Sequence, residues 1–255
     1  MNVSYRIHKL TKSDKSSFVS LMGRAFARDP LFLHLFGDSD LDRRAENDVA
    51  AFISFMFDKS FMFDEEVWGY YENGNLLGAY IVEKPQSGQF RNMRGGLWLI
   101  GRLIALFFQL SGKTLGFLNS YMRVTRSAAP PVAHHYLIMI GVKQEARGRG
   151  IGKALLQHLL HSGHSDRNSE GIALDTENPE NVGLYQSFGF ALTEETQIGK
   201  MPVYCMFNPK KTIQKFRESR QPCRTRKTGD PFGSPRQREE RDNLSFFIWK
   251  FTLRH

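Results

Sequence analysis

The sequence predicts a mixed α/β fold in which strands and helices follow each other along the chain. An unbroken apolar run over residues 136–142 has the length of a buried strand. A glycine-rich turn comes next, and apolar residues then recur at helical spacing over residues 153–160. A second short apolar run, residues 171–174, again precedes a segment that opens like a helix. Two strand-to-helix units of this kind indicate a sheet covered by helices.

The N-terminal quarter of the chain contains patterns for one strand and several helices. Residues 5–10 alternate like a strand, and Ser13-Asp14 can cap a helix that runs to Phe26. Asp29-Pro30 then breaks that helix, because proline cannot continue it. Residues 31–36 predict an aromatic-rich turn or short helix, and residues 43–63 predict a second long helix with one apolar face.

A hairpin and a long apolar segment follow. Residues 66–71 and 76–82 predict two strands joined by a turn at Asn73-Gly74. Residues 93–122 are strongly apolar and helical in character. A membrane span needs about 20 predominantly apolar residues, and here Arg102, Gln109 and Lys113 interrupt the run. We therefore expect this helix to cover the sheet rather than to cross a membrane.

The glycine-rich turn after residue 142 reads Arg147-Gly-Arg-Gly-Ile-Gly152. Glycine tolerates positive φ and lets the backbone come close to a ligand. Several N–H groups can then converge on one anion where the next helix begins. The turn therefore predicts a pyrophosphate site.

The spacing of the glycines excludes two cofactor classes. The dinucleotide pattern G-x-G-x-x-G would need its third glycine at Lys153 or at Leu155. The nucleoside triphosphate pattern G-x-x-x-x-G-K-[ST] would need glycine at Arg147 and a hydroxyl group at Ala154. Neither pattern fits.

What remains, Arg147-x-x-Gly150-x-Gly152 after a buried strand, resembles the pyrophosphate loop of the GCN5-related N-acetyltransferases. A second block strengthens the resemblance, because residues 178–190 contain the family pattern N-x-x-x-x-x-L-Y-x-x-x-G-F at its expected distance. Asn178-Pro179 opens this helix, and Gly189 is its C-terminal cap. Over residues 135–209 the chain is most similar to the puromycin N-acetyltransferase branch of the family.

The resemblance implies a fold and a reaction. The fold is a mixed, mostly antiparallel central sheet flanked by helices, with a V-shaped opening between the strand that ends at Val142 and the strand that ends near Asp175. Acetyl-CoA is the implied co-substrate, and its acetyl group passes directly to a primary amine of a small molecule. Two alternatives remain open: a protein lysine or N-terminal acetyltransferase, and a non-catalytic acetyl-CoA-binding module that binds a partner through a basic tail.

The resemblance also implies the residues around acetyl-CoA. The N–H groups of the turn hold the pyrophosphate, the backbone of residues 140–142 pairs with the pantetheine and polarises the acetyl carbonyl, and asparagines bond the pantetheine arm. The cofactor-binding residues are then Ile140, Gly141, Val142, Arg147, Gly148, Arg149, Gly150, Ile151, Gly152, Lys153, Asn178, Asn181 and Tyr185.

Two catalytic roles follow from the chemistry of the transfer. In the family, the tyrosine that matches Tyr185 lies near the cofactor sulfur, and a phenol with a reference pKa of about 10 suits protonation of the thiolate. The central strand carries no carboxylate, so Asp175 is the first candidate for the base, with Glu177 or the cluster of residues 64–66 behind it. Helix capping by Asp175 and Glu177, and a solvated loop for the cluster, are the alternative interpretations.

The positive charge of the chain is concentrated at its C-terminus. Of the net charge of +9, residues 209–255 carry +8, which leaves +1 for residues 1–208. We therefore expect an acetyltransferase domain over residues 1–208 that does not track a nucleic-acid backbone, and a basic, disordered tail over residues 209–255 with an apolar end. The tail is either a plain solvated extension or a binding segment for an acidic partner.

Cysteine and histidine usage favours a cytoplasmic enzyme without a metal. The only cysteines are Cys205 and Cys223, they form no C-x-x-C pair, and the N-terminus lacks an apolar signal segment. Adjacent strand residues point to opposite faces, so His134 and His135 are expected to be structural. The histidines at positions 158, 161 and 164 are expected to form a solvated helix face, because no cysteine or carboxylate completes a metal site there.

Overall fold

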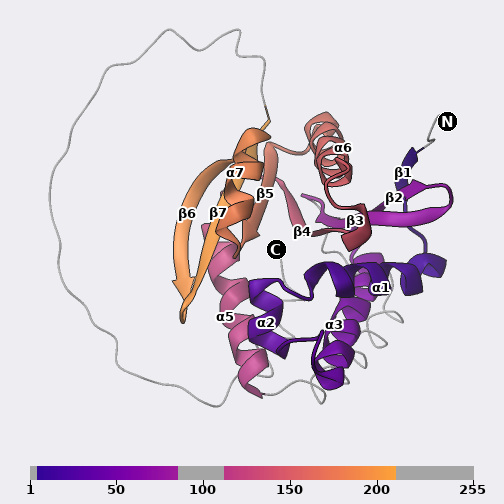
Figure 1. The fold of residues 1–255 in the computed structure, drawn as a ribbon. Coiled ribbons are helices and arrows are strands. Elements are labelled where there is room, and N and C mark those ends of the chain that lie inside the picture. Colours follow the sequence, from indigo (N-terminus) through magenta and orange to yellow (C-terminus); the bar gives the residue numbers. More distant parts are fainter. Residues whose placement is uncertain (1–4, 86–111, 211–255) are drawn as a thin grey trace, which may run out of the picture. The chain divides into compact units, whose positions relative to one another are not determined.

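The structure, a computed structural model, describes residues 5–85 and 112–210 (Figure 1). The strands of this part form one seven-stranded sheet in the order β1-β2-β3-β4-β5-β7-β6. Only β4 and β5 run parallel, and all other neighbours in the sheet are antiparallel. The expected mixed, mostly antiparallel sheet is confirmed. Its strands are β1 (Tyr5–Lys9), β2 (Glu66–Glu72), β3 (Asn75–Glu83), β4 (His135–Val142), β5 (Gly171–Thr176), β6 (Ala191–Ile198) and β7 (Met201–Pro209).

Helices cover both faces of the sheet. Figure 1 shows α6 above the sheet and α1, α2 and α3 below it. The upper core contains Leu155, Leu156 and Leu159 of α6, whereas the lower core contains Phe18 of α1 and Ile53 of α3. The helices are α1 (Lys15–Phe26), α2 (Pro30–Phe36), α3 (Arg43–Met62), α5 (Gly112–Ala128), α6 (Ile151–Ser165) and α7 (Pro179–Ser187).

Local signals explain most of these boundaries. The carboxylate of Asp29 accepts hydrogen bonds from the backbone N–H groups of Leu31 and Phe32, so it caps α2, whose first residue is Pro30. The predicted hairpin turn is also confirmed. Asn73 and Gly74 both have positive φ, 50° and 78°, as a two-residue turn between twisted strands requires.

Strand β6 has no counterpart in the sequence predictions. Nearly all of its residues are exposed, because it is an edge strand. The sequence Ala191-Leu-Thr-Glu-Glu-Thr-Gln-Ile198 therefore shows no alternation of apolar and polar side chains. The expected solvated histidine face is wrong at His158, which is half-buried and packs against Trp68 in a tilted arrangement, with 4.5 Å between the ring centroids.

Several predictions concern residues that the structure does not describe. Residues 93–111 of the expected long helix lie outside the described ranges, and its described continuation, α5, runs to Ala128. The tail after Lys210 and Cys223 within it also lie outside. The domain boundary after residue 208 stays a prediction, and β7 continues to pair with β5 through Pro209.

We predict that Gly171→Ala destabilises the fold. A Cβ atom at this position would lie 2.4 Å from the backbone oxygen of Asn208, so β5 and β7 would have to move apart. Overpacking of this kind costs about 1–3 kcal/mol. Urea denaturation measures the change. The matched control is Gly183→Ala in α7, where a Cβ atom would meet nothing within 4 Å and alanine should be neutral or stabilising. Equal stability of the two variants would contradict the prediction.

Candidate active site

The sheet opens between its two parallel strands. β4 and β5 pair only at His135↔Ile172, Tyr136↔Ala173 and Leu137↔Leu174. Beyond Leu137, β4 pairs with β3 on one edge and with none of the described strands on the other. The backbone of residues 138–142 therefore presents an unpaired strand edge to the opening.

A bulge in β4 begins where this pairing ends. Ile81 of β3 pairs with Met139, and the next residue, Val82, pairs with Leu137. Ile138 is thus an extra residue without a partner in β3. Bulges bend a strand and increase its twist, which gives a physical reason for β4 to leave β5 at this point.

The glycine turn lies at the end of β4, as the sequence predicts. Gly148 and Gly150 have φ of 77° and 80°, and Gly150 is the N-terminal cap of α6. A Cβ atom at either glycine would meet nothing within 4 Å, so backbone conformation and not packing calls for glycine here. Two arginines hold the turn in place: Arg149 pairs with Glu72 at 2.5 Å, and Arg147 donates to the carbonyl oxygen of Ala25 at 3.1 Å.

The remaining predicted cofactor residues lie on both sides of this turn. In β4, Gly141 is buried against α1, and a Cβ atom there would lie 2.8 Å from the sulfur of Met22. Ile140 and Val142 are half-buried and pack against the core under α6. After the turn, Ile151 is buried, Gly152 is half-buried and Lys153 is exposed at the start of α6.

Helix α7 follows β5 and carries Tyr185. Asn178 caps the helix by accepting a hydrogen bond from the N–H of Glu180 at 3.0 Å, and Asn181 donates to the hydroxyl of Thr176 at 3.4 Å. Tyr185 is buried and packs edge-on against Phe190. Loss of solvent, followed by the charges of nearby carboxylates, raises the pKa of Tyr185. The phenol therefore keeps its proton at neutral pH.

Asp175 and Glu177 meet at the end of β5. The hydroxyl of Tyr121, from α5, lies within hydrogen-bond distance of Oδ2 of Asp175 and of Oε1 of Glu177. Tyr136 donates to the other oxygen of Asp175. Burial raises the pKa of both carboxyl groups, that of Glu177 to about 8. The two tyrosines oppose this rise at Asp175, because they hydrogen bond to its ionised form.

Other groups complete the surroundings of this pair. Asp29 of α2 lies close enough for its charge to raise the pKa of Glu177. Arg126 of α5, which pairs with Glu83 at 2.7 Å, favours the ionised form of Asp175. Burial raises the pKa of the Cys205 thiol to about 12, so this cysteine, opposite Asp175 in β7, is neutral.

The acidic cluster of residues 64–66 is an alternative source for the base, but its carboxyl groups form ion pairs with lysines. Glu65 is buried and accepts hydrogen bonds from Lys59 and Ser60. Glu66 pairs with Lys9 at 2.6 Å, and Asp64 pairs with Lys84 at 2.8 Å. The interpretation of this cluster as a solvated loop is therefore wrong for Glu65.

Sequence reasoning missed Tyr121, Tyr136 and Asp29 as members of the site. Tyr121 lies in a helix with no motif, and 54 positions separate it from Asp175. The sequence indicates Asp29 only as part of the helix break at Asp29-Pro30. A usable signal existed for Tyr136 alone, since it lies on the parallel neighbour of the strand that carries Asp175.

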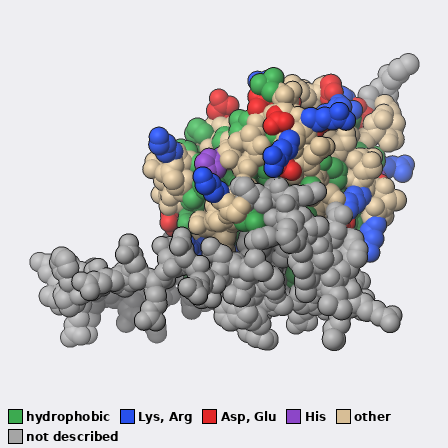
Figure 2. Space-filling view, turned by 90° about the horizontal axis from the view of Figure 1, so that it is seen from below, with side chains coloured by type: hydrophobic (Ala, Val, Ile, Leu, Met, Phe, Trp, Pro, Cys, Tyr) green, Lys and Arg blue, Asp and Glu red, His purple; other side chains and the backbone are tan. Residues whose placement is uncertain are grey.

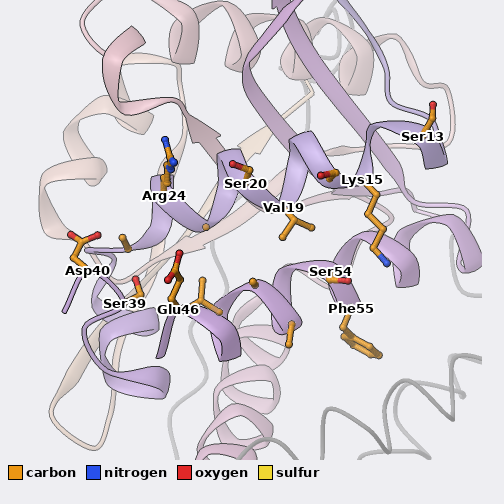
Figure 3. Close-up of a pocket in the computed structure, with 16 residues that line it drawn as sticks. Ser13, Lys15, Val19, Ser20, Arg24, Ser39, Asp40, Glu46, Ser54 and Phe55 are labelled. Carbon is orange, nitrogen blue, oxygen red and sulfur yellow. The ribbon is translucent and has the colours of Figure 1, made fainter. Parts of the chain in front are cut away.

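A separate hollow of about 990 Å³ lies between α1 and α3 and contains none of the predicted site residues (Figure 3). Ser16, Ser20 and Gly23 line it from α1. Phe18 and Met22, on the opposite face of that helix, pack toward the sheet. Helix α1 thus separates the hollow from the opening between β4 and β5. Among the described residues, no group of three or more His, Cys, Asp or Glu side chains could hold a metal ion.

A sheet that opens between two parallel strands, with a positive-φ glycine turn between one of them and the next helix, is the geometry that the resemblance to the N-acetyltransferases implies. Residues 36–190 match the family model described as "Acetyltransferase (GNAT) family". This match covers more than half of the chain, so the protein belongs to the GNAT acetyltransferase family. The enzymes of this family use acetyl-CoA.

Solved structures show the same fold. A structure of a histone acetyltransferase HPA2 and related acetyltransferase from Corynebacterium glutamicum aligns with a TM-score of 0.60 and 19% identity, over 82% of this chain and 98% of that chain. PH1933 from Pyrococcus horikoshii aligns with a TM-score of 0.51 and 13% identity, over 82% and 100% of the two chains. No curated protein matches the sequence. No helix in the described part of the chain is long and apolar enough to cross a membrane.

We predict that the free energy of unfolding falls as the pH rises from about 5 to 8. The pKa of Glu177 is about 8 in the folded protein, against 4.5 for an unperturbed glutamate. Between these values the folded protein binds more protons than the unfolded chain, so stability decreases by up to about 1.4 kcal/mol per pH unit. Glu177→Gln should remove much of this dependence in urea denaturation at several pH values. The exposed Glu180→Gln is the control and should keep it.

Proposed function

We propose that this enzyme transfers the acetyl group of acetyl-CoA directly to a primary amine of a small molecule. One observation carries the proposal. β4 and β5 separate after three paired positions, with a glycine turn after β4, Asp175 near the end of β5, and Glu177 and Tyr185 after β5. An anion-binding backbone and groups able to exchange protons therefore border one opening.

The cofactor would occupy this opening along the free edge of β4. Backbone N–H groups at the start of α6, including those of Gly152 and Lys153, would hold the pyrophosphate, beside the Arg149 side chain that pairs with Glu72. The backbone of residues 140–142 would pair with the pantetheine arm and polarise the acetyl carbonyl. Asn178 and Asn181 would bond the same arm from α7.

The proposed chemistry requires two proton transfers. The amine must lose a proton before its nitrogen attacks the thioester carbon, and Asp175 is the first candidate for this base, with Glu177 beside it. As the C–N bond forms, the C–S bond breaks and the thiolate takes the proton of Tyr185. The raised pKa of Tyr185 keeps the phenol protonated until the thiolate leaves, and it also makes the phenol a weaker acid than one with the reference pKa of about 10.

The structure around Asp175 and Glu177 favours a small acceptor over a protein. Helix α5, which carries Tyr121, also contacts α2: Thr114 donates to the carbonyl oxygen of Leu35, and the rings of His34 and Phe117 lie 4.2 Å apart. Glu177 is only 6% exposed. A buried carboxyl group enclosed by helices suits a compact amine better than an extended peptide.

The surface gives little support for a nucleic-acid acceptor. On the described part of the face in Figure 2, basic and acidic side chains are intermixed. The similar structure from C. glutamicum has a title that names a histone acetyltransferase, but its 19% identity supports only the fold. Release of free thiol from acetyl-CoA, measured against a panel of small amines and lysine or N-terminal peptides, tests both acceptor classes. Turnover of peptides alone would contradict the proposal, and so would the absence of turnover with every acceptor.

We predict that Gly150→Asp abolishes cofactor binding. The substitution places a negative side chain at a positive-φ position where the pyrophosphate is expected. Calorimetry with acetyl-CoA should show at least a tenfold loss of affinity. Gly199→Asp is the matched control, since Gly199 also has positive φ, 65°, and open space around it, but lies in the turn between β6 and β7. Equal affinities of the two variants would contradict this placement of acetyl-CoA.

We also predict that Tyr185→Phe lowers kcat by about 10- to 1,000-fold, the contribution of a positioned acid, and changes cofactor affinity by no more than a few-fold. The substitution removes the proton donor and preserves the ring that packs against Phe190. Single-turnover kinetics isolates the chemical step. Tyr70→Phe, in the same core but in β2, is the control. If Tyr185→Phe and Tyr70→Phe react equally fast, the side chain of Tyr185 contributes packing and does not donate the proton.

A further inference from the structure

The hydroxyl of Tyr121 lies between two carboxyl groups. Asp175 Oδ2 and Glu177 Oε1 are both within hydrogen-bond distance of it. Tyr121 is only 7% exposed, so water does not relieve these contacts. A hydroxyl group carries one proton and can donate it to only one oxygen. The second contact is a hydrogen bond only when the other carboxyl group is protonated and donates to Tyr121.

The second proton is not equally stable on the two carboxyl groups. Both oxygens of Asp175 accept hydrogen bonds from tyrosines, and Arg126 favours its ionised form. Among the described side chains, Tyr121 alone hydrogen bonds to Glu177. Glu177 otherwise has only its own backbone N–H as a donor. These contacts favour the ionised form at Asp175 and the proton at Glu177.

We propose that Tyr121 joins Asp175 and Glu177 into one base that holds a shared proton and takes up the proton released from the acceptor amine. This inference rests on the proposed function. It makes Tyr121 a positioning residue, because it acts through the two carboxyl groups.

The proton count of the reaction agrees with such a pair. Glu177 can pass its proton to the oxygen of Tyr121 while Tyr121 passes its own to Asp175, without movement of any heavy atom. Glu177 is then ionised and breaks an N–H bond of the incoming ammonium ion to form its own O–H bond. After the amine attacks and Tyr185 protonates the thiolate, the second nitrogen proton restores Tyr185. One proton per turnover remains on the pair and leaves to solvent.

The charged and titratable neighbours agree with uptake of a cationic acceptor. The charges that act on the pair or feel it come from Asp29, which caps α2, from Tyr185 of α7 and from Arg126 of α5. Tyr136 of β4 and Cys205 of β7 also face it, and Glu194 of β6 lies near Cys205. With the proton on Glu177, the carboxyl groups of Asp175 and Asp29 still oppose a single guanidinium group, that of Arg126, which already pairs with Glu83. An ammonium ion near Glu177 would offset this excess of negative charge.

The pH dependence of kcat/KM in matched variants tests the coupling. Both variants replace a tyrosine by phenylalanine. Tyr121→Phe removes a hydrogen bond from each of the two carboxyl groups, whereas Tyr136→Phe removes a hydrogen bond from Asp175 alone. We expect the acidic limb of the profile to move to higher pH by about one unit or more in Tyr121→Phe, and by less in Tyr136→Phe. The same amine is used with every variant, so the pKa of the acceptor is the same in all the profiles. Equal shifts would overturn the proposal.

Infrared spectroscopy of the full chain without substrates tests the shared proton independently of catalysis. At pH 7 the wild type should show the C=O band of a protonated buried carboxyl group, and Glu177→Gln should abolish it. Absence of the band in the wild type would overturn the proposal even if Tyr121→Phe failed to fold. Presence of the band without turnover of any amine would instead contradict the proposed function and leave the proton-sharing pair in place.

Discussion

The separation of β4 from β5 is the constraint on which the site depends. Parallel strands that paired along their whole length would use the backbone groups of residues 138–142 within the sheet. Because pairing stops after Leu137 and Leu174, the backbone groups of residues 138–142 that point away from β3 have no partner among the described strands. The bulge at Ile138 contributes the bend at the same position. The opening is thus a property of the backbone and does not require a mobile segment.

The same separation creates an electrostatic cost on the β5 side. Asp175 and Glu177 lie where water is largely excluded, and such groups favour their neutral forms unless partners stabilise the charge. Tyrosine hydroxyls supply that stabilisation only in part, so the pKa of Glu177 remains near 8. A structural role would not require two carboxyl groups to share one hydroxyl. Groups whose pKa is shifted toward neutrality by burial are typical of sites that exchange protons.

The sequence predicts the parts of the fold that have local causes. The Asn73-Gly74 turn needs positive φ, the Gly148 to Gly150 turn needs the same, and Asn178 caps the helix that it precedes, so each has a signature within a few residues. Strand β6 lacks one, because an exposed edge strand needs no apolar alternation. Tyr121 also has no local sequence signature, but for a different reason. Its partners lie near the end of β5 and directly after it, and only the packing of α5 brings Tyr121 to them.

This difference also explains why the cofactor class is easier to predict than the acceptor. The cofactor side of the opening consists of backbone groups whose positions depend on glycine and on one strand-to-helix turn. The acceptor side consists of side chains from α2, α5 and β5, segments that lie far apart along the chain. Substitutions in α2 or α5 can change which amine fits beside Glu177 without disturbing the turn that precedes α6. A short motif can therefore identify the cofactor, whereas the acceptor depends on how distant helices pack around the shared carboxyl groups.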